Sequence, residues 1–203
     1  MFLPFSKRAK DWEPHALRLR GMVCTNPRQS RFDPAELAPK LGLTVMPVSF
    51  GGLTADELRH LRTQGRSHWS GGVYPQPLPD GSFLCMLNPD DPPRRNRITL
   101  MEEICHRYFN HEPTKLVVRE DGLLIRDFND AQEKQAFGVG AAVLMPWSLF
   151  FPRLNNGMSS VELSEEFDVT TQLVEYRIKI AGAKKLYDAR QRSRLLSRRV
   201  AGL

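Results

Sequence analysis

Residues 98–111 contain the pattern that most restricts what this chain can fold into. A helix through this segment turns by about 100° per residue, so Glu102 and His106 lie one above the other and Glu103 lies on the adjacent edge. The neighbouring face is apolar and contains Ile98, Met101, Cys105, Tyr108 and Phe109. Two carboxylates and an imidazole are therefore expected at the margin of a hydrophobic core, and this placement predicts a metal site.

Taken one at a time, these residues also have simpler interpretations. Two consecutive glutamates on a helix are most often part of a solvated face, and a single boundary histidine is more often hydrogen-bonded than bound to a metal. Zinc held by two residues of one helix needs a third protein ligand and leaves one position for water. Glu133 is the candidate for that ligand, because it lies in the next expected helix, residues 131–144, whose small residues allow another helix to approach closely.

The composition is that of a soluble protein. The chain has 203 residues, 41% of them hydrophobic, which is enough for one sizeable core. No apolar run approaches the length of a membrane span, and the apolar opening is too short for a signal peptide, so we expect a cytoplasmic protein with no membrane contact. The odd, widely spaced set Cys24, Cys85 and Cys105 argues against a disulfide framework.

The formal net charge is +6, and the surplus lies at the two ends, in residues 7–10 and 190–199. Such basic runs are usually solvated tails. They permit DNA as an indirect partner without indicating it.

Capping residues and helix breakers predict the order of the elements. Helices are expected at residues 15–23, 34–40, from 54, at 98–111, 131–144, 161–167 and 171–181. Strands are expected at residues 43–50, 71–77, 82–87 and 115–119. Pro47 favours an edge position for the first strand, and Pro79-Asp80-Gly81 is typical of a turn between the second and third. The last two helices have the spacing of a small core with Arg177 outside it, which favours a structural or docking role over DNA reading.

The order of these pieces resembles the ImmA/IrrE family of bacterial metallopeptidases, whose members carry a Thr-Leu-x-His-Glu-x-x-His helix. Here the sequence reads Thr99-Leu-Met-Glu-Glu-Ile-Cys-His106, a variant of the zincin motif H-E-x-x-H. The following helix ends Val143-Leu-Met-Pro146, similar to the Leu-Leu-Met-Pro of the family. The segment from Leu163 to Thr170 is similar to its Leu-Ala-x-x-Phe-x-Val-Ser pattern. The resemblance covers roughly residues 15–182.

The resemblance implies an α+β fold: a zincin-like metallopeptidase core with a small antiparallel sheet packed on helices, followed by a helix-turn-helix-like segment. The expected division is a basic tail at residues 1–14, the peptidase core at 15–150, the C-terminal helical segment at 151–189 and a second basic tail at 190–203.

The resemblance also assigns roles to the motif residues. His106 matches the second helical ligand, and Glu103 matches the catalytic general base that takes a proton from the attacking water. Glu102 stands in the place of the first histidine ligand, and Glu133 matches the acidic third ligand. The implied cofactor is one zinc ion, although an oxygen-rich ligand set also suits another divalent metal.

Several residues near the motif have less definite roles. Gln135 and Phe137 stand where the family has an acidic residue and an asparagine. His111 points to another side of an ideal helix and is a candidate ligand or transition-state donor. Cys85 is a candidate regulatory thiol for the open metal position, whereas Cys105 belongs to the apolar face.

The function that the resemblance implies is a zinc-dependent endopeptidase. Its expected substrate is a helix-turn-helix transcriptional repressor, whose cleavage would derepress stress, mobile-element or phage-defence genes. The alternative is a catalytically inactive zincin-fold module that acts on a transcription regulator or on nucleic acid, because Glu102 replaces a histidine.

Overall fold

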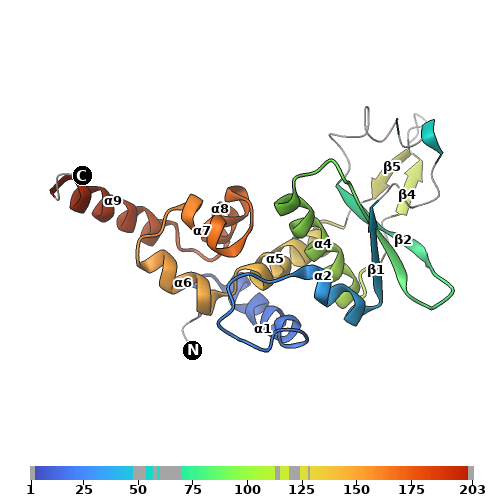
Figure 1. Cartoon of the computed structure of the whole chain (residues 1–203), viewed down its shortest axis with the longest axis horizontal. Helices are drawn as coiled ribbons and strands as arrows, with labels where there is room; N and C mark the ends of the chain where they lie inside the picture. Colours follow the sequence, from blue (N-terminus) through green and yellow to red (C-terminus); the bar gives the residue numbers. More distant parts are fainter. Residues whose placement is uncertain are drawn as a thin grey trace.

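The computed structural model describes residues 3–47, 54–56, 59, 70–112, 115–118, 124–127 and 129–200. The fold is α+β, as predicted, and it is mostly helical. Two packed helices, α4 (Pro93–Tyr108) and α5 (Asp130–Leu144), run through the middle of an elongated molecule. The strands lie at one end and the C-terminal helix α9 (Lys184–Val200) at the other (Figure 1).

The larger sheet contains β1 (Leu43–Pro47), β2 (Gly71–Pro77) and β3 (Phe83–Leu87) in the order β1-β3-β2. The pair β2-β3 is antiparallel, but β1 is parallel to β3, so the prediction of an antiparallel sheet is wrong for this strand. A parallel neighbour needs a crossover of a dozen or more residues. The connection from β1 to β3, residues 48–82 with β2 within it, provides that length. Pro47 does lie on an edge strand, as predicted.

Local signals correctly placed several of the other elements. The predicted helix from residue 34 forms as α2 (Pro34–Leu37) continued by the 3-10 helix η1 (Ala38–Leu41), with the Asp33 side chain accepting from the backbone N–H of Ala35. Gly81 adopts φ = 82° in the turn between β2 and β3. The helix predicted from Thr54 lies mostly outside the described residues.

A second sheet pairs the strands β4 (Lys115–Val118) and β5 (Leu124–Asp127) antiparallel. The strand β4 was predicted from the sequence, and β5 was not. The sequence between them contains Asp121-Gly122, a dipeptide that favours hairpins and was the available signal.

Helix α1 (Lys7–Gly21) occupies much of the segment expected as a basic tail at residues 1–14. The tail prediction is wrong because this segment has an apolar face as well as its lysines: Ala9 and Trp12 are buried. A Cβ atom added at Gly138 of α5 would lie 2.1 Å from the Trp12 ring. The absence of a side chain at Gly138 therefore permits the close approach of α1 to α5, in agreement with the predicted role of small residues in this helix.

A buried ion pair holds three helices together. Glu13 of α1 pairs with Arg177 of α8 (Thr171–Ile180), and both residues are buried. The Glu13 carboxylate also accepts from the backbone N–H of Trp147 at 3.0 Å, and Arg177 Nε donates to the carbonyl of Met145 at 3.1 Å. The prediction that Arg177 lies outside is wrong, because the pattern within one helix cannot reveal a carboxylate supplied by another.

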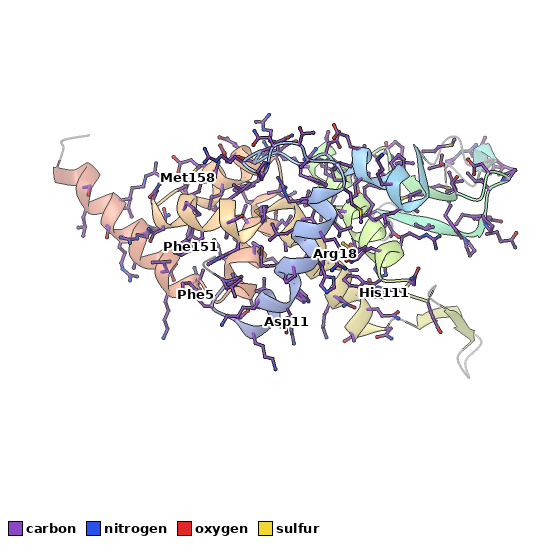
Figure 2. All side chains as sticks on the ribbon, turned by 90° about the horizontal axis from the view of Figure 1, so that it is seen from below. Phe5, Asp11, Arg18, His111, Phe151 and Met158 are labelled. Atoms are coloured by element: carbon purple, nitrogen blue, oxygen red, sulfur yellow. The ribbon has the colours of Figure 1, made fainter. Side chains whose placement is uncertain are left out.

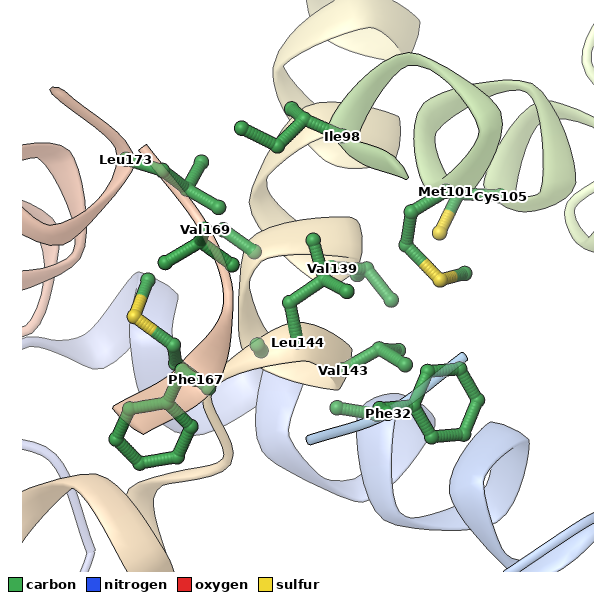
Figure 3. Packing of buried hydrophobic residues seen from close by; sticks show 14 of the residues in the cluster. Phe32, Ile98, Met101, Cys105, Val139, Val143, Leu144, Phe167, Val169 and Leu173 are labelled. Carbon is green, nitrogen blue, oxygen red and sulfur yellow. The ribbon is translucent and has the colours of Figure 1, made fainter. Parts of the chain in front are cut away.

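One hydrophobic cluster extends from α1 and α4 to the C-terminal helices (Figure 3). Met101 of α4, Val139 of α5 and Phe167 of α7 (Ser160–Phe167) are among its fully buried members. Helix α6 (Trp147–Asn155), which was not predicted, contributes Phe150 to the same cluster. The expected boundary at residue 150 therefore falls inside a helix and does not separate two cores.

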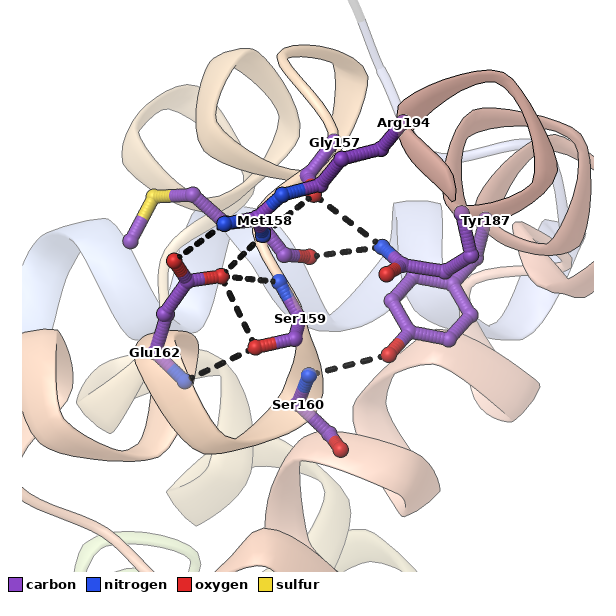
Figure 4. Close-up of polar contacts among 8 residues, drawn as sticks. Gly157, Met158, Ser159, Ser160, Glu162, Tyr187 and Arg194 are labelled. Atoms are coloured by element: carbon purple, nitrogen blue, oxygen red, sulfur yellow. Dashed lines mark hydrogen bonds and ion pairs between the residues drawn. The ribbon is translucent and has the colours of Figure 1, made fainter. Parts of the chain in front are cut away.

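The expected tail at 190–203 is helical as far as Val200, so that prediction is also wrong. An ion pair between Glu162 of α7 and Arg194 of α9 holds α9 against α7. Arg194 Nη2 donates to Glu162 Oε1 at 2.6 Å, and Arg194 Nη1 donates to Glu162 Oε2. The Tyr187 hydroxyl accepts from the backbone N–H of Ser160 at 2.9 Å (Figure 4). The N-cap of α7 is Ser159, which forms a reciprocal capping box with Glu162.

Among the described residues, no single helix is long and apolar enough to cross a membrane. Helices α5 and α6 reach that length and composition only as a pair, which is bent by 66° at their junction.

Candidate metal centre

The centre is formed by α4 and the first turn of α5. Glu102 and His106 lie one turn apart on α4, and Glu133 faces them from α5. One ligand atom from each of the three lies within 4.8 Å of the others, and His106 Nε2 is 3.5 Å from Glu133 Oε2. In a tetrahedral zinc site with bonds of about 2.0 to 2.1 Å, neighbouring ligand atoms are about 3.3 Å apart. These residues therefore fit one metal ion, with a position left for water or substrate.

The electrostatics of the candidate ligand set favour a cation. Burial, and after it the negative charges of Glu103 and Glu133, raise the pKa of Glu102 to about 7 against a smaller effect of Arg95. A divalent ion between the carboxylates would offset this repulsion. Burial lowers the pKa of His106 against the opposing charge of Glu133, which favours the neutral imidazole that binds metals.

Glu103 lies next to the ligand set without belonging to it. It is half-buried on α4, and its charge raises the pKa values of both Glu102 and Cys85. Its role as general base stays a prediction.

His111 approaches the centre from an unexpected direction. Asn110 adopts a left-handed conformation, φ = 50°, after the end of α4. The backbone N–H of His111 then donates to the carbonyl of His106 at 3.0 Å, and that of Asn110 donates to the carbonyl of Arg107 at 3.2 Å. This pair of bonds is a Schellman motif, which turns the chain back over the last turn of the helix.

The turn brings His111 against His106 rather than to the far side of the helix. The two Nδ1 atoms are 3.1 Å apart, and His111 Nε2 is 3.1 Å from Oε1 of Gln135 on α5. Figure 2 shows His111 beside the ends of α4 and α5. His111 is outside the group of three ligand residues, and its contact with Gln135 was not predicted from the sequence. The asparagine after the helix was the available signal for the turn.

The structure places Cys85 in the central strand β3, fully buried. Burial, together with the charge of Glu103, raises the pKa of its thiol to about 12, so the thiol is protonated at neutral pH. Among the described residues, Cys85 does not belong to the group of ligand atoms within 4.8 Å of one another. Cys105 is buried in the core, as its position on the apolar face of α4 predicted.

The comparison with protein families agrees with this geometry. The family model described as the IrrE N-terminal-like domain, of peptidase family M78, matches residues 75–179, which is more than half of the chain and includes the whole candidate centre. No curated protein matches the chain. The family supports a metallopeptidase with a divalent metal, usually zinc, on a zincin-like fold. The chain therefore belongs to the IrrE N-terminal-like family of M78 peptidases.

Proposed function

We propose that this protein is a zinc-dependent endopeptidase whose substrate is a helix-turn-helix transcriptional repressor. The observation that carries the enzymatic part is the meeting of Glu102, His106 and Glu133 across α4 and α5, with Glu103 beside them and outside the ligand set. The family membership supports the same activity.

When bound, the zinc ion supplies Lewis acidity, which polarises a peptide carbonyl and makes a bound water more acidic. Glu102, His106 and Glu133 would hold it, and the neutral imidazole of His106 keeps a lone pair for this purpose. Glu103 takes the proton from the attacking water and passes it to the leaving amine. Glu103 is adjacent to the candidate ligand Glu102 but is not itself one of the three ligand residues. Protonation of Glu103 therefore does not remove a bond to the metal.

The repressor substrate is the finer part of the proposal, and it rests on the ImmA/IrrE resemblance of the motif and of the segment after α6. Cleavage would separate the DNA-binding part of the repressor from the rest and so release the genes that it silences. Stress, mobile-element or phage-defence genes are the expected targets. The protein itself need not contact DNA in this scheme.

The competing function is a binding module that keeps the fold without hydrolysis. Glu102 supports it, because a carboxyl with a pKa of about 7 is partly protonated at neutral pH and must lose that proton to bind a metal. A loosely held metal would leave a protein that recognises a regulator without cleaving it.

The deciding experiment compares the wild type with Glu103→Gln, using a helix-turn-helix transcriptional repressor as substrate. Elemental analysis should find about one zinc ion per chain in both proteins, while cleavage falls by about 10² to 10⁴-fold in the variant. Glu175→Gln, an exposed position on α8, is the matched control and should cleave at the wild-type rate. Zinc binding without any cleavage by the wild type would favour the binding module. Full cleavage by Glu103→Gln would show that the base is wrongly assigned.

A further inference from the structure

Four side chains form a continuous polar line that passes through the candidate metal position. Gln135 Oε1 lies 3.1 Å from His111 Nε2, His111 Nδ1 lies 3.1 Å from His106 Nδ1, and His106 Nε2 faces Glu133 Oε2 at 3.5 Å. The two histidines come from the end of α4 and the turn after it, and the other two residues come from α5.

The donor and acceptor roles along this line are linked. A neutral imidazole has one N–H donor and one acceptor nitrogen. A hydrogen bond between the two Nδ1 atoms requires that one of them carries the proton and the other does not. The state of His111 therefore decides which nitrogen of His106 is free.

Gln135 decides the state of His111. Its Oε1 only accepts, so His111 Nε2 must donate and His111 Nδ1 must accept. His106 Nδ1 then donates to His111, and the lone pair of His106 Nε2 is left facing Glu133. If the amide of Gln135 were turned over, each role would reverse, and His106 Nε2 would carry a proton and could not bind a metal.

We propose that His111 and Gln135 are positioning residues that hold His106 in the tautomer whose Nε2 binds the metal. The proposal rests on the metal site of the proposed function and gives His111 a role other than ligand or transition-state donor. Metal-bound histidines commonly donate their second N–H to an acceptor; here that acceptor is a second histidine, whose own orientation depends on an amide.

The surroundings keep this line in place. The Phe109 ring stacks on the His111 ring, with centroids 5.4 Å apart and an interplanar angle of 16°. The Schellman turn fixes the backbone of His111 to the carbonyl of His106. Both contacts hold the His111 ring in position before any metal is bound.

The first test measures zinc affinity by chelator competition, on proteins whose fold is checked by circular dichroism. Gln135→Met removes the acceptor at similar volume and should weaken zinc binding by about 10 to 100-fold. Gln135→Glu can only accept and should bind zinc at least as tightly as the wild type. Gln132→Met, three residues earlier on α5, is the matched control and should leave the affinity unchanged.

The second test reads the tautomers directly, by ¹⁵N NMR of the zinc-loaded wild type with labelled histidines. We expect the proton on Nδ1 of His106 and on Nε2 of His111. The opposite tautomer at either ring overturns the proposal, as does an unchanged affinity in Gln135→Met. This spectrum also decides the question if the methionine variant does not fold.

The experiments distinguish a wrong positioning role of His111 and Gln135 from a wrong metal site. If the wild type binds no zinc, or if His106→Ala binds it as tightly as the wild type, the proposed metal site itself is wrong. If His106→Ala loses zinc while Gln135→Met and Gln135→Glu both bind zinc with the affinity of the wild type, only the positioning role of His111 and Gln135 is wrong.

Discussion

Glu13 on α1 and Arg177 on α8 form an ion pair almost completely closed to solvent, with side chains that are 1% and 0% exposed. Since Glu13 also accepts from the start of α6 and Arg177 donates to the end of the α5 segment, the pair connects the N-terminal helix to the C-terminal half of the core. Loss of one member leaves the other charge buried without its partner.

We therefore expect Glu13→Ala to lower the free energy of unfolding by about 3 to 5 kcal/mol, as measured by urea denaturation. Asp188→Ala is the control, because it breaks the exposed pair between Lys184 and Asp188 on α9. That change should cost about 1 kcal/mol or less. Equal losses in the two variants would contradict a special role for the buried pair.

Gly138 should be the most sensitive glycine of α5. A Cβ atom at this position would overlap the Trp12 ring, so Gly138→Ala must push α1 away from α5. We expect a loss of about 1 to 3 kcal/mol in the free energy of unfolding, as is typical of overpacking. Gly72→Ala, where nothing lies within 4 Å of the added atom, is the control for the substitution itself. Comparable melting temperatures for both variants would refute the close contact.

The docking of α9 should depend on pH through Glu162. The Arg194 guanidinium and the Ser159 cap hold the pKa of Glu162 well below its ordinary value of about 4.5. The stabilisation is therefore fully present above about pH 4.5 and is lost as the pH falls below it. The melting temperature of the wild type should be higher than that of Glu162→Gln at pH 7. The difference between the two melting temperatures should become smaller as the pH falls below about 4.5. Glu165→Gln, a neighbouring exposed position, should show no such trend.

Glu102→His should tighten zinc binding, because it restores the usual family ligand and because the raised pKa of the Glu102 carboxyl means that it must lose a proton to bind a metal at pH 7. Chelator competition at pH 7 measures the change. Glu175→His on the surface of α8 serves as the control for an added histidine. If Glu102→His binds zinc more weakly than the wild type, the site is adapted to an oxygen-rich ligand set.

Cys85 is the proposed regulatory thiol, and its role stays a prediction. A thiol lock on the open metal position would require Cys85 to lose its proton to the metal, against a pKa of about 12. If the lock operates, Cys85→Ser raises basal cleavage of the repressor and Cys24→Ser does not. Unchanged basal cleavage in both variants would show that Cys85 does not regulate the activity.

Much of the local structure was predictable, because the signals act within a few residues. Asp33 caps α2, Gly81 takes its positive φ in the β2-β3 turn, and Thr170 caps α8. The spacing of Glu102 and His106 also follows from helical periodicity alone, and it places both on one face of α4.

The sequence by itself determined the candidate ligand pair on α4 and the helix that carries Glu133, since helical periodicity and end signals are properties of one segment. Only the tertiary structure decided that Glu133 faces that pair at 3.5 Å from His106 and that Arg177 is buried against Glu13. It also decided that His111, after the local turn that follows α4, reaches Gln135 on α5. The physical reason is that these contacts join separate elements, so each depends on packing distances that no pattern within a single helix contains.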